Sequence, residues 1–490
     1  MRGDNLKKKS LGVNALLNSI QSILNLIFPL ITFPYISRVL SVDGVGKYNF
    51  SNSFVSYFIL LAGLGISTFA VREGAKYRDD REKISEFASR VFTINIASTF
   101  VSYVILFVTL LIVPSLEKYK MAILIFSIQI FFTTLGTDWV YIIFEEYGYI
   151  TARNIAFKIL SIVLLFAFVR NSGDYLKYAT ITVFASTGSY ILNFLHAKKF
   201  CDIKIVWKFN WKPYLIPIFI IFGSTVSIQL YVSVDTILLG FLKSDYVVGI
   251  YGTSVKIYTL VVTLLAAMLN VTVPRIAFLI GQKRSQEFRK LFKKLVNTIL
   301  AIAIPGVVGL FMIAKNIIIL LASTKYLEAV SSLKILSFAI LGSILNGLVQ
   351  NCALIPAKRE KNVLFSTTIT AIVNILLNLV LIPKFSENAA AFTTVVAELL
   401  MFVMNCYFAK DIIDFIFKDK QLMKNIVVSL ISCFGIVISC ILCQQLINSV
   451  LLQLLVSVVA SAFLYGASML LFRNTFALDV ISQIKLRLRN

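Results

Sequence analysis

Long apolar stretches recur along the whole chain, each close to the length of a bilayer-spanning helix and separated by short polar breaks. A transmembrane helix needs about 20 mostly apolar residues. The pattern therefore predicts an all-α, polytopic membrane protein with about fourteen transmembrane helices. The predicted spans are residues 11–40, 49–70, 91–113, 120–143, 152–169, 177–197, 214–240, 249–271, 295–314, 329–350, 363–382, 389–409, 425–446 and 449–472.

The composition supports this class. Of the 490 residues, 58% are hydrophobic and 14% are charged, whereas soluble domains usually carry about 25% charged residues. The short segments of alternating polarity that mark outer-membrane barrels do not occur. The basic start, MRGDNLKKKSLG, continues into the first span without a small-residue cleavage site, so we expect no cleaved signal peptide. Because that span contains Pro29 and Pro34, we expect it to bend or tilt.

The charges predict the orientation of the spans. Lysine and arginine number 47, and the formal net charge is +23. Roughly 35 of these cations fall in the two termini and in every second loop, which the positive-inside rule places in the cytoplasm. We therefore expect a multi-pass protein of the inner (cytoplasmic) cell membrane with both termini cytoplasmic. Anionic lipid headgroups are the expected counter-charge, and we expect no nucleic-acid partner.

The sequence contains a weak internal repeat. When the chain is shifted by about 203 residues, VGKYNFSNSFVSYF (45–58) aligns with VGIYGTSVKIYTL (248–260), and such repeats often mark a transporter's two halves. The copies lie on the second and eighth spans, an offset of six spans, so they have the same orientation and the repeat is parallel. We expect an N-lobe over residues 1–200 (spans 1–6) and a C-lobe over 201–412 (spans 7–12). Residues 413–490 form spans 13 and 14 and a cytoplasmic tail.

Polar residues form stripes on the first two spans of each half. Single polar residues within a membrane usually bond between helices, but repeat-related stripes favour one shared hydrated cavity, because polar faces avoid lipid. The substrate-binding candidates on the first, second and eighth spans are Asn14, Asn18, Gln21, Asn25, Ser53, Ser56, Lys256, Thr259, Thr263 and Asn270.

Lys256 is the most informative of these residues. It lies inside the eighth span, where a cation costs about 2.5–3.5 kcal/mol on insertion scales. Lysine is a competent phosphate partner, which favours contact with an anionic ligand. The alternatives are snorkelling of the ammonium to the outer surface and a salt bridge to Asp235 on the seventh span.

Other charged residues within or beside the spans are candidates for ion pairs or gates. Arg38 closes the first span and either pairs with Asp43 or forms an outer gate. Asp138, near the cytoplasmic end of the fourth span, is expected to pair with Arg153 or Lys158.

The predicted C-lobe has its own candidates. Lys334 and Glu398 are expected to pair with each other, and Glu398 could instead bind a coupling ion. A polar face on the eleventh span could line a second groove; it consists of Thr367, Thr370, Asn374 and Asn378.

The sequence predicts neither an enzyme nor a cofactor site. We find no P-loop, no G-x-S-x-G and no H-E-x-x-H motif, and the chain has one histidine. Among the six cysteines, Cys440 and Cys443 form a C-x-x-C and share a helix face with Cys433 inside the thirteenth span. Small packing residues explain this face better than a metal does, and no Cys/His cluster accompanies it, so we expect no metal site.

Two stretches resemble the Wzx-type polysaccharide flippases, which carry O-antigen or capsule repeat units and belong to the multidrug/oligosaccharidyl-lipid/polysaccharide exporter superfamily. These are FPYISRVLSVDGVGKYNFSNSFVSYFILLAGLGISTFAVREGA (33–75) and VVGIYGTSVKIYTLVVTLLAAMLNVTVPRIA (247–277). The resemblance implies two six-helix lobes in a V with two extra C-terminal helices. It also implies that an undecaprenyl-diphosphate-linked oligosaccharide moves from the cytoplasmic to the outer leaflet.

The implied partners are a polyprenyl-diphosphate-linked glycan and membrane lipid; a coupling ion, H⁺ or Na⁺, and a polysaccharide polymerase complex are left open. The related lipid II flippases carry several arginines on their first two spans and eighth span. This chain has Asn, Gln and Ser there and keeps Lys256, which favours a different glycan.

Two rival functions remain. A cation-coupled multidrug antiporter of the same superfamily would need an acid in the N-lobe cavity, and the stripes of the first two spans contain none. A membrane glycosyltransferase or polymerase would need an acidic pair in a large outer loop, and the predicted outer loops are short.

Overall fold

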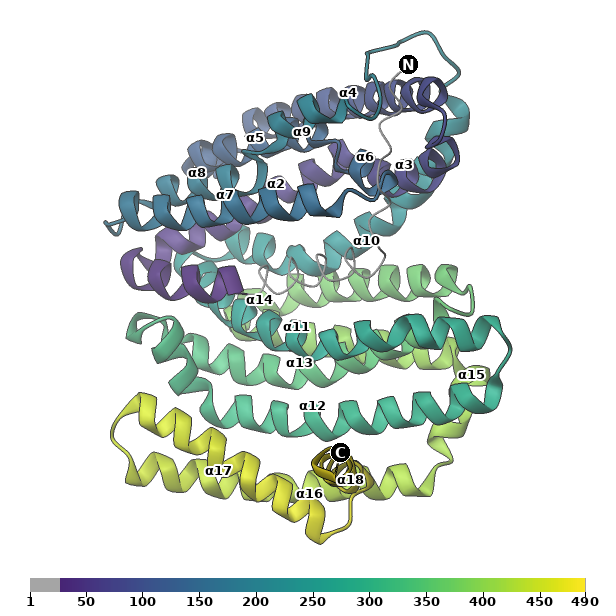
Figure 1. Ribbon diagram of the computed structural model, residues 1–490. Coiled ribbons are helices and arrows are strands. Elements are labelled where there is room, and N and C mark those ends of the chain that lie inside the picture. Colours follow the sequence, from purple (N-terminus) through teal and green to yellow (C-terminus); the bar gives the residue numbers. More distant parts are fainter. Residues whose placement is uncertain (1–26, 490) are drawn as a thin grey trace. The chain divides into compact units, whose positions relative to one another are not determined.

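The computed structural model describes residues 27–489, and its elements are helices joined by short connections (Figure 1). The chain divides into two compact units, Met1–Gly249 and Ile250–Asn490, and each is described by itself. The predicted lobe boundary at residue 200 lies earlier than this division. The reason is that α10 (Lys212–Leu242) packs against α2 (Val42–Gly63) and α3 (Ile66–Gly74) of the first unit. The lobes themselves stay a prediction.

The first unit starts, within the described residues, with a helix over Ile27–Val39. Its further elements are α2, α3, η1 (Ala75–Tyr77), α4 (Arg81–Ile112), η2 (Pro114–Tyr119), α5 (Lys120–Gly136), α6 (Asp138–Ile143), α7 (Tyr147–Phe168), α8 (Tyr175–Thr187), α9 (Tyr190–Ala197), α10 and the first turn of α11 (Asp245–Gly281). In this unit α2 packs against α4, α5 and α10, and α8 packs against α5 and α7.

The second unit contains the rest of α11 and the C-terminal helices. These are α12 (Ser285–Leu321), η3 (Thr324–Tyr326), α13 (Ala329–Val349), the π-helical turn η4 (Gln350–Leu354), α14 (Glu360–Phe408), α15 (Lys410–Phe417), α16 (Lys420–Leu446), α17 (Val450–Leu471) and α18 (Thr475–Arg489). Here α12 packs against α13, α16 and α17.

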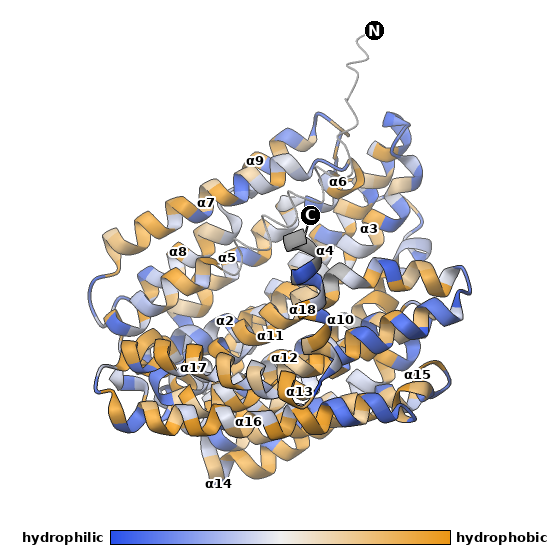
Figure 2. Ribbon diagram, turned by 60° about the horizontal axis from the view of Figure 1, so that its bottom comes forward, coloured by the Kyte–Doolittle hydropathy of each residue, from blue (hydrophilic) through white to orange (hydrophobic). Residues whose placement is uncertain are grey.

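Eleven helices in the described part of the chain are long and apolar enough to cross a membrane. Three places account for the difference from the fourteen predicted spans. The first span starts before residue 27, the sixth is divided into α8 and α9, and α14 joins the eleventh and twelfth spans. Hydrophobic residues cover the middles of the long helices and hydrophilic residues collect at their ends (Figure 2). An all-α polytopic membrane fold is confirmed.

The 49-residue α14 consists of two helices. Ser386, with φ 52° and ψ −131°, interrupts it shortly after Pro383. Thr393 Oγ1 donates to Asn378 Oδ1 at 2.6 Å, and 15 residues of continuous helix would hold these residues about 22 Å apart. The chain therefore reverses at Ser386, which separates the two predicted spans.

Several helices extend beyond the predicted spans at the ends expected to be cytoplasmic. The helix of the third span begins at Arg81 rather than at residue 91, because Asp80 caps it by accepting from the backbone N–H groups of Glu82 and Lys83. The bond from the Lys83 N–H lowers the pKa of the Asp80 carboxyl. Polar helix ends are invisible to a prediction based on apolar runs, which explains the difference.

Two spans of the first unit break within their length. The second span breaks at Leu64 and Gly65, with φ 44° and 73°. A break frees backbone groups that lipid cannot satisfy. Here α4 supplies donors, because Asn95 Nδ2 lies 2.9 Å and Ser98 Oγ 2.5 Å from the carbonyl oxygen of Ala62. The fourth span breaks in the same way at Thr137, with φ 42°.

Candidate functional site

Three predicted substrate-binding residues share an exposed face of α11. The side chains of Lys256, Thr259 and Thr263 are exposed, whereas the neighbouring Ile257 and Tyr258 are 2% and 9% exposed. Thr263 Oγ1 donates to the Thr259 carbonyl oxygen at 2.7 Å, a bond within the helix. Lys256 forms no hydrogen bond or ion pair with any residue that the structure describes. Within the part of the chain that the structure describes, this polar face is therefore open to a ligand or solvent.

The polar stripe of α2 is instead bonded to another helix. Ser56 Oγ donates to the carbonyl oxygen of Ser53 at 2.6 Å and accepts from Gln229 Nε2 of α10 at 2.7 Å. Gln229 Nε2 also donates to Ser233 Oγ at 2.8 Å. In this conformation Ser56 serves helix packing, and the substrate contacts of Ser53 and Ser56 stay predictions.

The polar stripe of the first span cannot be placed. The side chain of Asn270 on α11 is also outside the described residues. The predicted residues of the first span outside the described range are Asn14, Asn18, Gln21 and Asn25.

Two predicted charged residues retain open roles. Asp235 on α10 is 6% exposed, and its ion pair with Lys256 would join the two units, so that pair stays a prediction. Arg38 Nη1 donates to the carbonyl oxygen of Pro34 at 2.8 Å. Its pairing with Asp43, or its use as an outer gate, also stays a prediction.

Asp138 pairs with Arg153 at the break between α5 and α6. Arg153 Nη2 lies 3.4 Å from Asp138 Oδ1, and the arginine side chain is 6% exposed. Asn193 Nδ2 donates to Asp138 Oδ1 at 2.6 Å and to the freed carbonyl oxygen of Gly136 at 3.0 Å. Two further nitrogens of Arg153, Nε and Nη1, have no hydrogen-bond partner among the described residues. The buried arginine therefore depends on Asp138 as its carboxylate partner.

The predicted pair of Lys334 and Glu398 does not form among the described residues of the second unit. Lys334 Nζ lies 5.0 Å from the ring centroid of Phe311, whereas Glu398 is 6% exposed and its Oε1 lies 3.4 Å from Tyr258 Oη. A Cβ added at Gly342 would lie 2.9 Å from Glu398 Cβ. Glu398 is therefore level with Gly342, about 12 Å along α13 from Lys334. An ion-binding role for Glu398 stays a prediction.

The polar face of the eleventh span packs inside the second unit and does not line a groove. Asn378 Nδ2 donates to Asn374 Oδ1 at 3.1 Å. The exposed fractions of Thr367, Thr370, Asn374 and Asn378 are 7%, 0%, 1% and 0%.

The first turns of α2 and α11 cross in close backbone contact, and both lie at the predicted outer end of the first unit. A Cβ added at Gly46 would lie 1.7 Å from the carbonyl oxygen of Asp245, and one added at Gly249 would lie 2.3 Å from that of Val42. Gly46 thus faces the carbonyl of Asp245, four residues before Gly249, and Gly249 faces the carbonyl of Val42, four residues before Gly46. The sequence repeat pairs these same glycines, so the crossing is reciprocal.

Side chains brace this glycine crossing. Asp245 Oδ1 accepts from Lys118 Nζ at 2.8 Å and also from Tyr119 Oη. The Tyr119 ring stacks on Phe50 of α2 at 4.0 Å between centroids. The start of α11 is therefore held on both α2 and η2.

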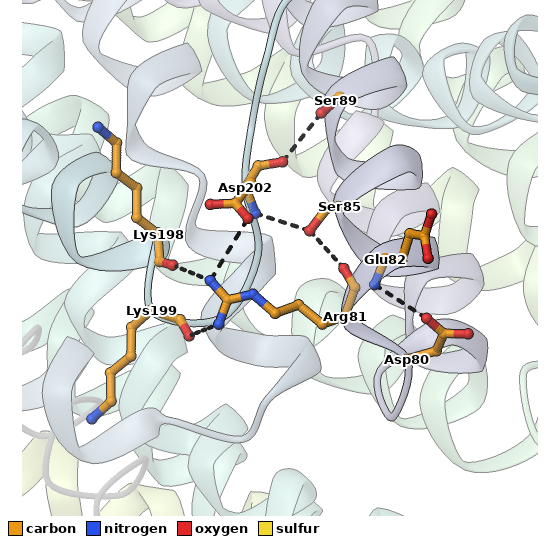
Figure 3. Close-up of polar contacts among 8 residues, drawn as sticks. All are labelled: Asp80, Arg81, Glu82, Ser85, Ser89, Lys198, Lys199 and Asp202. Carbon is orange, nitrogen blue, oxygen red and sulfur yellow. Dashed lines mark hydrogen bonds and ion pairs between the residues drawn. The ribbon is translucent and has the colours of Figure 1, made fainter. Parts of the chain in front are cut away.

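A hydrophilic groove of about 600 Å³ lies at the predicted cytoplasmic end of the first unit. One wall is the start of α4 and the other is the extended segment that follows α9 (Figure 3). Arg81 donates to the carbonyl oxygens of Lys198 at 3.0 Å and Lys199 at 3.3 Å, and it lies 3.7 Å from Asp202 Oδ2. It thereby satisfies carbonyls at the C-terminus of α9.

The second unit has a larger groove of about 1030 Å³ beside α15. At its edge Arg359 makes a bidentate pair with Asp411, with both distances 2.6 Å. This pair lowers the pKa of the Asp411 carboxyl.

A family model described as "Polysaccharide biosynthesis protein" matches residues 11–280, more than half of the chain. The chain belongs to the polysaccharide biosynthesis protein family. A second family model, "MatE", matches residues 221–383 of the chain. A curated relative from Escherichia coli (strain K12), "Putative O-antigen transporter", is 25% identical over 275 residues, 56% of this chain and 66% of the relative. The match thus spans slightly less than two thirds of that relative's length.

Two solved structures share the fold of this chain. "Lipid II flippase MurJ, inward closed conformation" superposes with a TM-score of 0.74 at 17% identity, covering 96% of this chain and 99% of that one. An inward-facing multidrug resistance transporter of the MATE family and the MOP superfamily superposes with a TM-score of 0.63 at 14% identity, covering 83% and 99%. At these identities the likeness concerns the fold alone.

Several residues of these contacts do not stand out from the sequence pattern. Gly46, Gly249 and Asp245 were overlooked as a contact, although the aligned V-G-x-Y motifs carried the signal. Gln229 was overlooked because a single amide within an apolar span does not show which helix it faces.

Proposed function

We propose that this protein moves a polyprenyl-diphosphate-linked oligosaccharide from the cytoplasmic to the outer leaflet by alternating access. This proposal rests on the exposed polar face of α11, where Lys256 has no partner among the described residues. Family membership and the names of the similar proteins, an O-antigen transporter and a lipid II flippase, support this cargo class.

The chemistry of this face suits the cargo. The ammonium of Lys256 would hold a diphosphate oxygen, because lysine pairs with phosphate as a point charge. Thr259 and Thr263 offer hydroxyls for sugar or phosphate oxygens on the same exposed face. Without a bound anion, an unpaired cation at this depth carries an insertion cost of about 2.5–3.5 kcal/mol. A ligand that pairs with Lys256 offsets this cost.

The glycine crossing supplies the outer closure in this proposal. In this proposal, cargo release to the outer leaflet requires the first turns of α2 and α11 to separate, which would open the backbone contact at Gly46 and Gly249. An inside-negative potential favours outward movement of an anion by about 2.3 kcal/mol per charge per 100 mV. A coupled ion, H⁺ or Na⁺, would add to this drive.

The antiporter alternative has one observation in its favour, the similarity to a multidrug transporter fold. Such a transporter would use a buried acid for its cation. Asp235 and Glu398 are acids of this kind, each 6% exposed, whereas Asp138 is already paired with Arg153. A cation carrier gives no role to the exposed Lys256, so the phosphate proposal is preferred.

The test is a set of Lys256 variants expressed in the native host. Lys256→Met keeps the length of the side chain and removes its charge, so it should insert at least as well as wild type. Lipid-linked glycan should then accumulate on the cytoplasmic side. Lys256→Arg should retain part of the transport. As a control, Lys290→Met removes a charge from the exposed start of α12 and should leave transport unchanged.

A double variant separates the two roles of the lysine. If Lys256 merely neutralises Asp235, Lys256→Met combined with Asp235→Asn should restore transport. If it holds the cargo, the double variant should be as inactive as Lys256→Met. Full transport by Lys256→Met alone would refute the phosphate role.

A further inference from the structure

Residues 202–211, the extended part of the connection between α9 and α10, are here called the strap. The strap is fixed along α4. Three hydroxyls spaced four residues apart on α4 accept hydrogen bonds from backbone N–H groups spaced two residues apart on the strap. Four helical residues rise about 6 Å and two extended residues about 6.6 Å, so the spacings match. The bonds run from the N–H of Asp202 to Ser85 Oγ at 2.9 Å, Lys204 to Ser89 Oγ at 3.0 Å and Val206 to Thr93 Oγ1 at 2.9 Å.

The strap holds an apolar patch outward between two lysines. Ile205, Val206 and Trp207 are 54%, 37% and 58% exposed. Lys204 and Lys208 on either side are exposed, and neither forms an ion pair with a described residue. Because the strap is bonded to α4, these five side chains are held in place, and the described residues leave them exposed.

Basic residues are in slight excess around this patch. Lys204 and Lys208 line the groove along α4 together with Arg81, Arg90, Glu82, Glu86 and Asp202, and Glu86 is paired with Arg90. The strap's acid, Asp202, lies beside the Arg81 guanidinium, which reduces its effect on the lysines. Lys198 and Lys199 give their carbonyl oxygens to Arg81, while their ammonium groups point away from the cluster (Figure 3). The exposed lysines of the strap are thus joined by two more from the end of α9.

We propose that the strap is a lipid-docking surface, which inserts Trp207 among the headgroups of the cytoplasmic leaflet and selects anionic lipid through Lys204 and Lys208. Tryptophan favours the membrane–water interface, and basic residues near an anionic surface gain binding energy. The strap joins helices at the predicted cytoplasmic end, which is where such a surface is present. This inference holds whatever cargo the protein carries.

Tryptophan quenching in nanodiscs tests the proposal. The chain has three tryptophans, Trp139, Trp207 and Trp211, of which Trp139 is 5% exposed and Trp211 stacks on Trp207. The difference between wild type and Trp207→Phe therefore isolates the contribution of Trp207. Brominated phosphatidylglycerol and brominated phosphatidylcholine are compared at equal mole fractions in mixed bilayers. We expect a quenched component that disappears in Trp207→Phe and is stronger with brominated phosphatidylglycerol.

The lysines are tested by the preference for the anionic lipid. Replacing Lys204 and Lys208 by glutamine should reduce this preference, roughly five-fold per lysine from the binding energy of one basic residue near an anionic surface. As a matched control, Lys283→Gln with Lys290→Gln removes two exposed lysines from the second unit and should leave Trp207 quenching unchanged.

Three outcomes would overturn the proposal. Quenching of Trp207 by aqueous iodide but not by brominated lipid would place the strap in the cytosol, where it would suit a protein partner. Equal quenching by both lipids would remove the anionic selectivity. An unchanged preference in the Lys204 and Lys208 variant would remove the role of these lysines. Glycan export is a separate measurement, so failure of the cargo proposal would leave these results unaffected.

Discussion

The glycine crossing offers the sharpest test of how the protein opens. Gly46→Ala adds one methyl group at a helical position, where alanine fits the backbone better than glycine does. The added Cβ, however, would lie 1.7 Å from the carbonyl oxygen of Asp245 and 2.6 Å from its carbonyl carbon. Both are backbone atoms of the adjoining helix and cannot rotate away, so the two helices must separate.

The expected magnitude follows from this overlap. Ordinary contacts of a Cβ begin near 3.4 Å, so the helices must separate by more than 1 Å. Inserting a methyl group into a packed contact costs about 1–3 kcal/mol, which corresponds to about 5- to 150-fold in the closed–open equilibrium. Gly249→Ala meets the reciprocal contact with Val42. Because one separation relieves both overlaps, the double variant should cost less than the sum of the single variants.

The assay measures access to α2 from the predicted outer side. In a Ser53→Cys background, an impermeant thiol reagent added outside should label faster when Gly46→Ala is present, and glycan export should change. The background is the parent chain, whose six cysteines are free and, apart from the half-buried Cys406, buried. Gly63→Ala is the matched control, since it lies on the same helix and, among the described residues, no atom from outside its own helix backbone lies within 4 Å of its added Cβ.

Equal labelling and export for Gly46→Ala and Gly63→Ala would refute a moving contact at this crossing. A loss of expressed protein for Gly46→Ala would instead indicate that the contact is needed for folding. Additive effects in the double variant would contradict the reciprocal geometry.

Three further predictions test other parts of the structure. With both termini cytoplasmic, Ser115→Cys in η2 should be labelled from outside intact cells and Gln282→Cys should be protected; the opposite pattern would reverse the orientation. Asp138→Ala removes the carboxylate partner of the buried Arg153 and should lower stability by about 3–5 kcal/mol, measured by thermal unfolding in detergent. The double variant Asp138→Asn with Arg153→Met should lower stability by less than Asp138→Ala does. A larger loss of stability in the double variant would show that the pair itself stabilises the unit.

Much of the fold could be predicted because each transmembrane helix satisfies its own backbone bonds and must be apolar over a bilayer's thickness. These requirements act on consecutive residues, so the apolar runs located the spans without knowledge of their neighbours. The division of the eleventh and twelfth spans followed from the polar residues near Ser386, although the structure has one nearly continuous run of helix there.

The candidate site was predicted less completely, because helical periodicity shows which residues share a face but not what that face meets. Lys256 and Ser56 both lie on polar stripes. The structure leaves Lys256 exposed, whereas Ser56 is bonded to Gln229. Lys334 and Glu398 were matched by charge, but their levels along α13 and α14 keep them apart.

The sequence by itself thus determined the membrane class, the approximate spans, the polar faces and the repeat, since each depends on local hydropathy or direct comparison of residues. Only the tertiary structure decided which helix faces meet and which residues lie at the same level along neighbouring helices. It paired Gly46 and Gly249 across a helix crossing, supplied Asn95 and Ser98 to the break in the second span, and fixed the strap on α4. These contacts depend on the register between helices, which side-chain packing sets and a one-dimensional pattern does not contain.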